Sequence, residues 1–375
     1  MLKNIFLSIL AITLIIACND TEEIDNGPNN DDFNRQGMLI NLADNIIIPA
    51  YQNLNTKLDL LVSSKDIFIS SPNLDNLNLI RSSWLNAYKS WQSVEMINIG
   101  KAEEILYHYQ MNIYPTDIND IENNIAIGNV DLTHPNNNDA VGFPALDYML
   151  FGLETTDTAI IQKYTSNVDA ENYKMYLSDL VMQMKSLTEL VLNDWTSSYK
   201  DIFTSSSSNS ATSGVNMFIN DFIFYYEKGL RANKIGIPAG NFSATTLPEK
   251  VEAFYNKEVS KILSLEALNA VQDLFNGKTY VGDSSNPSQP SLGSSFNDYL
   301  TYLDKSDLAS LINDKFDIAR QKIQLLDNNF FNQVNTDNVK MTQAYDALQT
   351  VVVLLKVDML QVFNISVDYV DADGD

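Results

Sequence analysis

Apolar residues recur along most of this chain at intervals of three and four positions, the spacing that places side chains on one face of a helix. The clearest stretch begins at Leu77 and continues through Ile80, Trp84, Tyr88 and Trp91. Runs of alternating apolar and polar residues, which indicate strands, are scarce. The pattern therefore predicts an all-α protein in which most helices lie antiparallel to their neighbours, as in a helical bundle.

Further stretches show the same helical periodicity. They are residues 34–62, 167–195, 216–235, 248–275, 306–328 and 337–363. Pro49 lies inside the first of these stretches. We expect it to kink or interrupt that helix, because proline has no backbone N–H to donate.

Two polar stretches separate the helical patterns. Residues 204–210 are rich in serine, and residues 282–290 combine glycine, serine and proline. Such compositions are typical of flexible linkers or exposed loops. The first stretch divides the chain into two helical halves of similar length. The predicted organisation is one bundle at residues 33–203, a Ser-rich linker at 204–214 and a second bundle at 215–375.

The N-terminus has the pattern of an export signal. Lys3 precedes an apolar run from Ile5 to Ile16 that is too short to span a bilayer, so residues 1–17 are predicted to be a signal peptide. Cys18 follows a Leu-Ile-Ile-Ala sequence that reads as a lipobox. We expect Cys18 to become the lipidated first residue of the mature protein and to anchor it to a membrane. The alternative is an ordinary cleaved signal followed by an incidental cysteine.

The segment after the anchor and the net charge exclude some kinds of partner. Residues 18–32 are rich in Asp, Glu, Asn, Gly and Pro, and they lack the apolar residues that offset ordering entropy, so they predict a flexible tether. The chain has a formal net charge of -24, which disfavours nucleic acid and anionic lipid headgroups as partners. With a single cysteine it forms no internal disulfide, and its stability must come from the core.

A short apolar segment at residues 142–152 carries one carboxylate, Asp147, between two glycines. Pro144 suits the first turn of a helix, and Gly152 suits its end. Asp147 would then lie near the positive end of the helix dipole, which is a sufficient structural reason for an acid at this position. The functional alternative places Asp147 in a pocket between the two halves, as an oxygen ligand for a hard cation.

Glu95 lies four residues after Trp91 and extends the same apolar face. A carboxylate on a buried face must be paired, protonated or bound to a cation. If the helix instead frays near Gly100, Glu95 is exposed. The pattern leaves both readings open, and Glu95 is the second candidate metal ligand beside Asp147.

Two basic residues, Arg231 and Lys234, are candidates for contacts with an anionic ligand or cofactor. Arg231 lies four residues after Glu227, the spacing of a surface ion pair on a helix. Lys234 precedes Gly236 and Pro238, which are expected to end the helix, so its charge complements the helix dipole. Alternatively, the two basic residues bind an anionic ligand or neutralise the two candidate carboxylates.

Several signatures of chemistry are missing from the sequence. His108 and His134 have no second histidine at helical ligand spacing, so the zinc pattern His-Glu-x-x-His is missing. There is also no Gly-x-Ser-x-Gly, phosphate loop or dinucleotide fingerprint. Residues 371–375 begin like a calcium loop, but the chain stops before such a loop supplies its later ligands. This tail is either a packed acidic terminus or part of a weak cation site that other segments complete.

Three internal segments and the acidic tail, in this order after a lipobox, resemble the imelysin-like family of bacterial envelope proteins, which is named after a reported insulin-cleaving protease. The segments are residues 84–95, 142–152 and 230–240. The family pattern is Gly-x-His-x-x-Glu, in which Gly142 matches, Pro144 replaces the histidine and Asp147 replaces the glutamate. The resemblance is closest to lipoproteins of the Bacteroidetes type. It implies two packed helical bundles, a site at their junction and an association with iron uptake.

The first functional hypothesis is a non-catalytic binding lipoprotein of the outer membrane, on its periplasmic or cell-surface face, that serves iron or metal uptake. Its ligand would be iron or chelated iron, with calcium as an alternative metal, and an outer-membrane receptor would be its partner. Asp147 and Glu95 would supply oxygen ligands, and Arg231 or Lys234 would supply compensating charge.

Two alternatives remain open. A metallopeptidase needs about three protein ligands for a catalytic zinc. Because Pro144 removes the family's imidazole, His134 would have to fold into the site. The other alternative is a surface lipoprotein that binds a protein or a glycan through grooves lined by some of its 18 tyrosines. The residues leave the question of enzymatic activity open.

Overall fold

The computed structural model describes residues 31–208, 210, 212–282 and 291–369. The predicted signal peptide, Cys18 and the tail at residues 371–375 lie outside these ranges, as does nearly all of the predicted tether.

From Phe33 onward the chain forms one compact unit. Its described elements are helices, and the only β-pairing among the described residues is one antiparallel bridge between Lys278 and Leu292. The all-α prediction is therefore confirmed. Across the described ranges, no helix combines the length and the apolar character needed to cross a bilayer.

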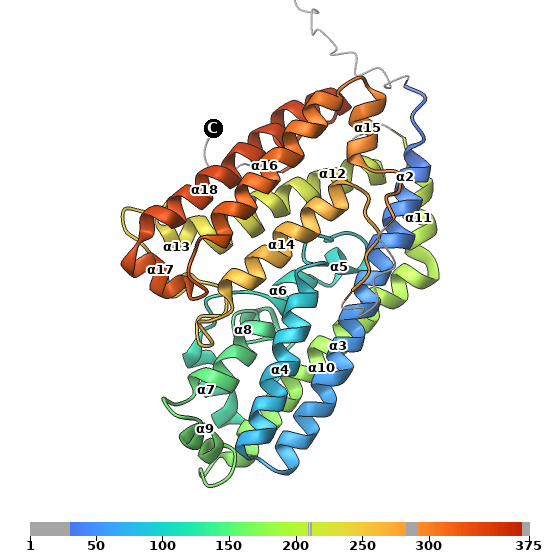
Figure 1. The fold of residues 1–375 in the computed structure, drawn as a ribbon. Helices are drawn as coiled ribbons and strands as arrows, with labels where there is room; N and C mark the ends of the chain where they lie inside the picture. Colours follow the sequence, from blue (N-terminus) through green and yellow to red (C-terminus); the bar gives the residue numbers. More distant parts are fainter. Residues whose placement is uncertain (1–30, 209, 211, 283–290, 370–375) are drawn as a thin grey trace, which may run out of the picture. The chain divides into compact units, whose positions relative to one another are not determined.

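Three long helices form the centre of the N-terminal half. They are α3 (Ile48–Ser70), α4 (Leu74–Trp91) and α10 (Ala170–Asp194). Helix α3 packs along both α4 and α10 (Figure 1). The apolar face predicted from Leu77 to Trp91 is buried in this contact, so the periodicity identified the packed face of α4 correctly.

The helical path of α3 begins earlier in the chain, with α2 (Arg35–Leu42) and a π-helical turn, η1 (Ala43–Ile47). Pro49 does not break this path. It lies in the first turn of α3, directly after the change to π winding. Proline offers no N–H to the Asn45 carbonyl four residues earlier, and that carbonyl accepts the backbone N–H of Tyr280 at 2.8 Å instead. The proline thus frees an acceptor for a segment far away in the sequence.

Short elements connect α4 to α10. They are α5 (Lys101–Glu104), α6 (Tyr107–Met111), α7 (Ile118–Ile127), the 3₁₀ turn η2 (Pro135–Asn137), α8 (Gly142–Asp147), the π-helical η3 (Tyr148–Gly152) and α9 (Asp157–Lys163). Helix α8 contacts both α4 and α10. Beyond α10 the helical path continues through the π-helical η4 (Trp195–Tyr199) into α11 (Lys200–Ser205).

The C-terminal half is also helical. Its elements are α12 (Gly214–Phe224), the π-helical η5 (Tyr225–Gly236), α13 (Ile237–Ala239), the 3₁₀ turn η6 (Pro248–Lys250), α14 (Ser260–Phe275), α15 (Phe296–Tyr302), α16 (Ser306–Gln324), α17 (Phe330–Thr336), α18 (Asn338–Val353), the π-helical η7 (Leu354–Met359) and α19 (Leu360–Phe363). Helix α18 packs against α16 and η5, and α14 packs against the same two elements. Helix α14 also contacts α4 and so joins the two halves (Figure 1). The predicted bundle boundary at residues 204–214 remains a prediction.

Several predicted helix limits differ from the observed ones. Helix α3 continues to Ser70 instead of ending near residue 62, and two further differences affect the site. The helix expected to end near Gly236 and Pro238 continues to Ala239 and ends at Gly240, which has a positive φ of 84°. The helix expected over residues 248–275 begins only at Ser260. Before it, Ala253 and Lys257 have φ angles of 57° and 68°. These left-handed conformations exclude a continuous helix.

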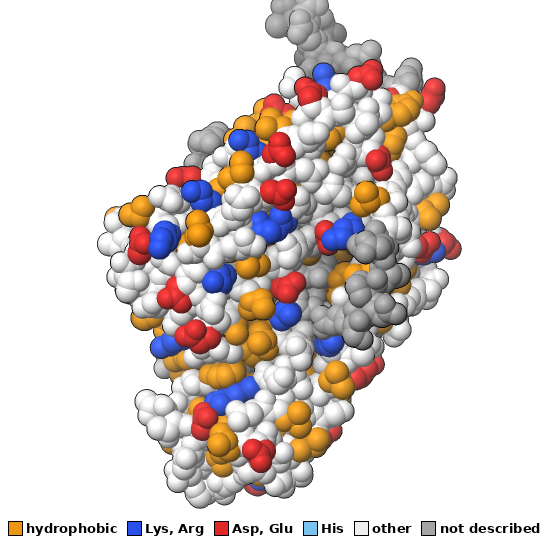
Figure 2. Space-filling model, in the orientation of Figure 1, with side chains coloured by type: hydrophobic (Ala, Val, Ile, Leu, Met, Phe, Trp, Pro, Cys, Tyr) orange, Lys and Arg blue, Asp and Glu red, His pale blue; other side chains and the backbone are white. Residues whose placement is uncertain are grey.

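The surface carries charges of both signs. On the face shown in Figure 2, acidic and basic side chains are interspersed and do not gather into a patch of one sign. The large negative net charge is therefore not concentrated in one strongly acidic patch on this face.

Candidate functional site

Glu95 is buried, although it does not lie on a helix. Helix α4 ends at Trp91, and a series of turns follows in which the Glu95 N–H donates to the Trp91 carbonyl at 2.9 Å. Its side chain accepts hydrogen bonds from Asn112 Nδ2 at 2.6 Å and from the Tyr225 hydroxyl at 2.9 Å. The helix ends before Glu95, as one of the two interpretations of the sequence expected. Glu95 is nevertheless only 7% exposed, and its carboxylate is paired, as the other interpretation required.

Lys234 brings a positive charge to this buried carboxylate. Its Nζ lies 3.2 Å from Glu95 Oε2 and 2.7 Å from an oxygen of a second carboxylate, Glu252. All three side chains are buried. The position of Lys234 in the sequence predicted that its charge complements the helix dipole at the end of the helix. Its ammonium group instead contacts the two carboxylates. It does neutralise Glu95, which was the alternative drawn from the sequence.

Glu252 was missed in the sequence because residues 248–275 have helical spacing. It lies in the irregular segment 251–259, next to the strained Ala253. Its Oε1 accepts hydrogen bonds from Asn112 Nδ2 at 3.1 Å and from Gln92 Nε2 at 3.3 Å. An acid inside the apolar run Val-Glu-Ala-Phe was the available signal. We call Glu95, Lys234, Glu252, Asn112 and Gln92 the buried charge cluster.

Electrostatics keep the Lys234–Glu95 pair ionised. Burial alone would raise the pKa of Glu95, but the Lys234 ammonium and the hydrogen bonds from Asn112 and Tyr225 hold that pKa below its ordinary value. Burial alone would lower the pKa of Lys234, but Glu252 and Glu95 raise it. The buried charge cluster contains two carboxylates and one ammonium group. With both carboxylates ionised, the cluster has an excess of one negative charge.

Two acceptor atoms of the cluster have no hydrogen-bond partner among the described residues. They are Gln92 Oε1 and Glu252 Oε2, and both atoms are buried. Buried acceptors are almost always satisfied by protein, water or ligand. Their position beside an excess negative charge makes the cluster suited to hydrogen-bond donors or to positive charge.

Asp147 does not join this cluster. Its two oxygens accept the backbone N–H groups of Tyr255 and Asn256 at 2.7 and 2.9 Å. Burial raises the pKa of Asp147 to about 7, against the lowering effect of those two hydrogen bonds. Asp147 is the last residue of α8, so it does not occupy the helix start expected from the sequence. Its evident role is to hold the segment that carries Glu252.

The glycines of the 142–152 segment permit close packing. Gly142 has a φ of 74°, and a Cβ at this position would lie 2.2 Å from the Met111 carbonyl oxygen. A Cβ on Gly152 would lie 2.4 Å from the Tyr255 ring. The segment is thereby fixed between α6 and the segment that follows η6.

A cavity of about 240 Å³ lies beside the buried charge cluster. Its lining includes Tyr114, Pro144, Asp147, Val251 and Ala253. The last two flank Glu252, so that residue lies in the segment that forms this wall. Burial raises the pKa of Tyr114 well above its ordinary value, and Glu252 and Glu95 add to this shift. Tyr114 thus lines the cavity and lies close enough to the two carboxylates of the cluster to feel their charge.

Arg231 belongs to a different buried group. Its Nη2 lies 3.5 Å from Glu227, and both side chains are only 1% exposed, so the pair predicted at the surface is buried. The Arg231 guanidinium also donates to Tyr345 and Gln349. Arg231 and Lys234 therefore contact separate acidic partners, although they are close in sequence.

The remaining candidates lie elsewhere. His134 is exposed and accepts the N–H of Asn136. His108 lies near Glu95 and Lys234, and burial lowers its pKa. Among the described residues, one group of three carboxylates lies close enough to share a cation, and it consists of Asp117, Asp120 and Asp139. The assignment of Asp147 and Glu95 as metal ligands remains a prediction.

Comparisons with known proteins agree with this fold. The family model of imelysin, a peptidase family of type M75, matches residues 47–356. An imelysin-like protein from Psychrobacter arcticum 273-4 has a TM-score of 0.68 at 17% identity, covering 90% of this chain and 97% of its own. A protein described as an iron-regulated protein A precursor, from Parabacteroides distasonis ATCC 8503, has a TM-score of 0.68 at 20% identity with the same coverage. No curated protein matches the chain.

Proposed function

This chain belongs to the imelysin family, and we propose that it is a non-catalytic binding protein of the cell envelope that serves iron acquisition. The association with iron is supported by the name of one protein of similar fold, the iron-regulated protein A precursor. The location is supported by the signal peptide and lipobox pattern around Cys18. A lipid on Cys18 would hold the protein at the outer membrane, where an iron receptor is the expected partner.

The observation that carries the binding role is the pair of unsatisfied acceptors, Glu252 Oε2 and Gln92 Oε1, in a cluster with excess negative charge. A ligand that donates hydrogen bonds or brings positive charge would satisfy both. The adjoining cavity of about 240 Å³ is smaller than most sites for drug-sized ligands, which begin at about 300 Å³. The ligand is therefore compact.

A bare iron ion does not fit the cluster. Iron held by both carboxylates would need the space between Glu95 and Glu252, and the Lys234 ammonium lies there, within 3.2 Å of both. At the motif position where the family has histidine, Pro144 offers no ligand atom. We therefore propose a chelated form, in which the chelator supplies most of the iron's ligands and the protein contacts the rest.

In this proposal the ligand enters the cavity beside Tyr114 and reaches the unsatisfied acceptors through the wall formed by residues 251–253. The strained backbone of Ala253, with a φ of 57°, favours this wall as the part that adjusts, since such strain is common at ligand-binding segments. Asp147 contributes by holding the N–H groups of Tyr255 and Asn256, and so limits the movement of the segment.

Ferric nitrilotriacetate is a suitable probe, because it is compact and retains metal-bound water that donates hydrogen bonds. Intrinsic tryptophan fluorescence, to which Trp91 directly before Gln92 contributes, reports binding to the mature protein. We expect saturable quenching, weakened about tenfold in Glu252→Gln, which loses a charged acceptor. The same change at the exposed Glu258, in the same segment, is the matched control.

Two results would contradict the proposal. One is an absence of saturable binding of the ferric chelate. The other is binding that Glu252→Gln and Glu258→Gln leave equally strong. Calcium chloride and iron-free nitrilotriacetate, titrated in parallel, separate recognition of the iron chelate from recognition of a hard cation or of the chelator alone.

A further inference from the structure

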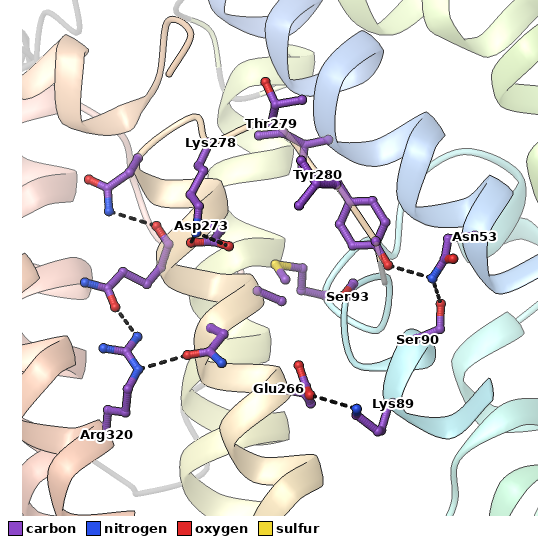
Figure 3. A pocket seen from close by; sticks show the side chains of 18 of the residues that line it. Asn53, Lys89, Ser90, Ser93, Glu266, Asp273, Lys278, Thr279, Tyr280 and Arg320 are labelled. Atoms are coloured by element: carbon purple, nitrogen blue, oxygen red, sulfur yellow. Dashed lines mark hydrogen bonds and ion pairs between the residues drawn. The ribbon is translucent and has the colours of Figure 1, made fainter. Parts of the chain in front are cut away.

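A second and larger cavity lies between α4 and α14. It is an open cleft of about 560 Å³ (Figure 3). Lys89 and Ser90 lie on the α4 side, and Glu266 and Asp273 lie on the α14 side. Residues 278–282 form a further part of its lining. The cleft is separate from the cavity beside Asp147, since the described residues that line the two are all different.

The turn after α4 separates the cleft from the buried charge cluster. Ser93 and Met96 line the cleft. Gln92 and Glu95, on the same turn, make their side-chain contacts inside the cluster. The cleft therefore presents a surface of its own, and its chemistry differs from that of the cluster.

Each cation of the cleft is paired with a carboxylate. Lys89 Nζ lies 3.3 Å from Glu266, and Lys278 Nζ lies 2.9 Å from Asp273. The third cation, Arg320, lies 2.5 Å from Asp317. Charges cancel locally, in a chain whose net charge is -24. Among the described residues of this lining, a strongly charged ligand would find no unpaired charge of opposite sign.

Neutral polar groups make up much of the remaining lining. The carboxamides are Asn53, Asn86, Asn269, Gln272 and Asn276, and the hydroxyls are Ser90, Ser93, Thr279 and Tyr280. The side chains of Asn86 and Ser93 make no hydrogen bond to any described residue, and the Asn269 amide nitrogen makes none either. The Asn269 carbonyl oxygen accepts from Arg320 at 2.9 Å. The free groups include both donors and acceptors.

An aromatic ring is fixed on one wall. The Tyr280 backbone N–H donates to the Asn45 carbonyl that Pro49 leaves free, and its hydroxyl accepts from Asn53 Nδ2 at 2.8 Å. Asn53 also donates to Ser90, at 2.8 Å. Figure 3 shows the Tyr280 ring directed toward Asn53 and Ser90. The ring is therefore held at both ends, beside polar groups of the lining.

We propose that this cleft binds a neutral, polyhydroxylated ligand of the oligosaccharide class. A sugar hydroxyl both donates and accepts a hydrogen bond, as the carboxamides and serine hydroxyls of the cleft do. The C–H face of a sugar ring packs on an aromatic ring, and Tyr280 supplies one. The volume lies within the range of about 300–1,000 Å³ that is usual for small-molecule sites.

The test is calorimetric titration of the full mature protein with neutral trisaccharides: maltotriose, cellotriose, triacetylchitotriose and raffinose. Trigalacturonate and spermidine serve as anionic and cationic probes. We expect at least one neutral trisaccharide to bind, and the double variant Asn86→Ala, Asn269→Ala to weaken that binding about tenfold. Both asparagines are exposed, so folding is expected to survive. The matched control is Asn193→Ala, Asn335→Ala, at exposed sites outside the cleft.

A steric variant gives a second measurement. Ala270 lines the cleft, and Ala270→Phe fills part of it without removing a polar group, so it should abolish the same binding. The proposal is overturned if none of the neutral trisaccharides binds, if a charged probe binds more tightly than all of them, or if the cleft variants bind as the control does. Circular dichroism of each variant establishes that the helices are intact.

Discussion

The ammonium group of Lys234 lies 2.7 Å from Glu252 Oε1, and each side chain is only 1% exposed. The two residues come from different elements, the π-helical η5 and the irregular segment before α14. Glu95 contacts the same ammonium, with its Oε2 at 3.2 Å. One cation therefore links η5 and the nearby segment before α14 to the turn after α4, which is far away in the sequence.

Replacing Lys234 by methionine should be strongly destabilising. The change leaves two buried carboxylates without their cation, and loss of one partner from a buried ion pair costs about 3–5 kcal/mol. Urea denaturation measures the free energy of unfolding. Lys340→Met is the matched control, because Lys340 is half exposed in its pair with Asp337, and such pairs contribute at most about 1 kcal/mol. Equal losses in the two variants would argue against the central role of Lys234.

Replacing Glu252 by glutamine should cost much less than replacing Lys234. The variant keeps the size of the side chain and leaves Lys234 balanced by Glu95 alone, so no charge in the cluster remains uncompensated. We expect a loss of about 1 kcal/mol, the net contribution of one hydrogen bond. The same urea experiment checks this ranking. A loss as large as that of Lys234→Met would show that Glu95 cannot compensate Lys234 by itself.

Gly142→Ala should destabilise the fold by about 3 kcal/mol or more. The residue has a φ of 74°, and the new Cβ would lie 2.2 Å from the Met111 carbonyl oxygen, so strain and overlap both contribute. Gly128 has a φ of 86°, but its nearest neighbour would be 3.7 Å away. With a ψ of -130°, Gly128 has a backbone conformation that L residues avoid, so Gly128→Ala should show only this conformational cost, about 1–3 kcal/mol. Thermal or urea unfolding of both variants compares the two, and indistinguishable losses would remove the case for close packing at Gly142.

Asp147 should make stability fall as the pH rises from about 4 to about 7. Burial raises the pKa of Asp147 to about 7 in the fold, whereas an unfolded chain has an ordinary Asp pKa of about 3.9. The folded protein therefore keeps a proton that the unfolded chain has lost in this window, and the stabilisation is fully present only below it.

In Asp147→Asn this part of the pH dependence should disappear. Urea unfolding at several pH values between 4 and 8 measures the slope in both proteins. The same change at the exposed Asp201 should leave the slope unaltered. Parallel curves for the wild type and Asp147→Asn would mean that Asp147 titrates as an ordinary carboxylate.

The helical fold followed directly from the sequence because the apolar face of a helix such as α4 repeats over many turns. What spacing could not predict is a change of winding. The π-helical η5 carries Tyr225, Glu227, Arg231 and Lys234. A π-helix has a wider turn than an α-helix, so α-helical spacing misassigned Arg231 and Glu227 to the surface.

The site was predictable only in part. Glu95 stood out because an acid extended an apolar face, and Lys234 stood out as a possible neutralising partner. Glu252 did not, because its segment has the spacing of a helix while Ala253 and Lys257 adopt left-handed conformations. Long-range packing imposes those conformations, and no local signal in a single sequence reports it. Asp147 was noticed for its motif, but its two backbone partners come from more than 100 residues away.

The turn that follows α4 has a consequence for regulation. Ser93 and Met96 line the cleft between α4 and α14, whereas Gln92 and Glu95 make their side-chain contacts in the buried charge cluster. A ligand that binds on one side of this turn and shifts it alters how well a ligand fits on the other side. Because such coupling is reciprocal, each ligand then changes the affinity of the protein for the other ligand by the same factor. Such coupling through one turn needs no movement of the long helices.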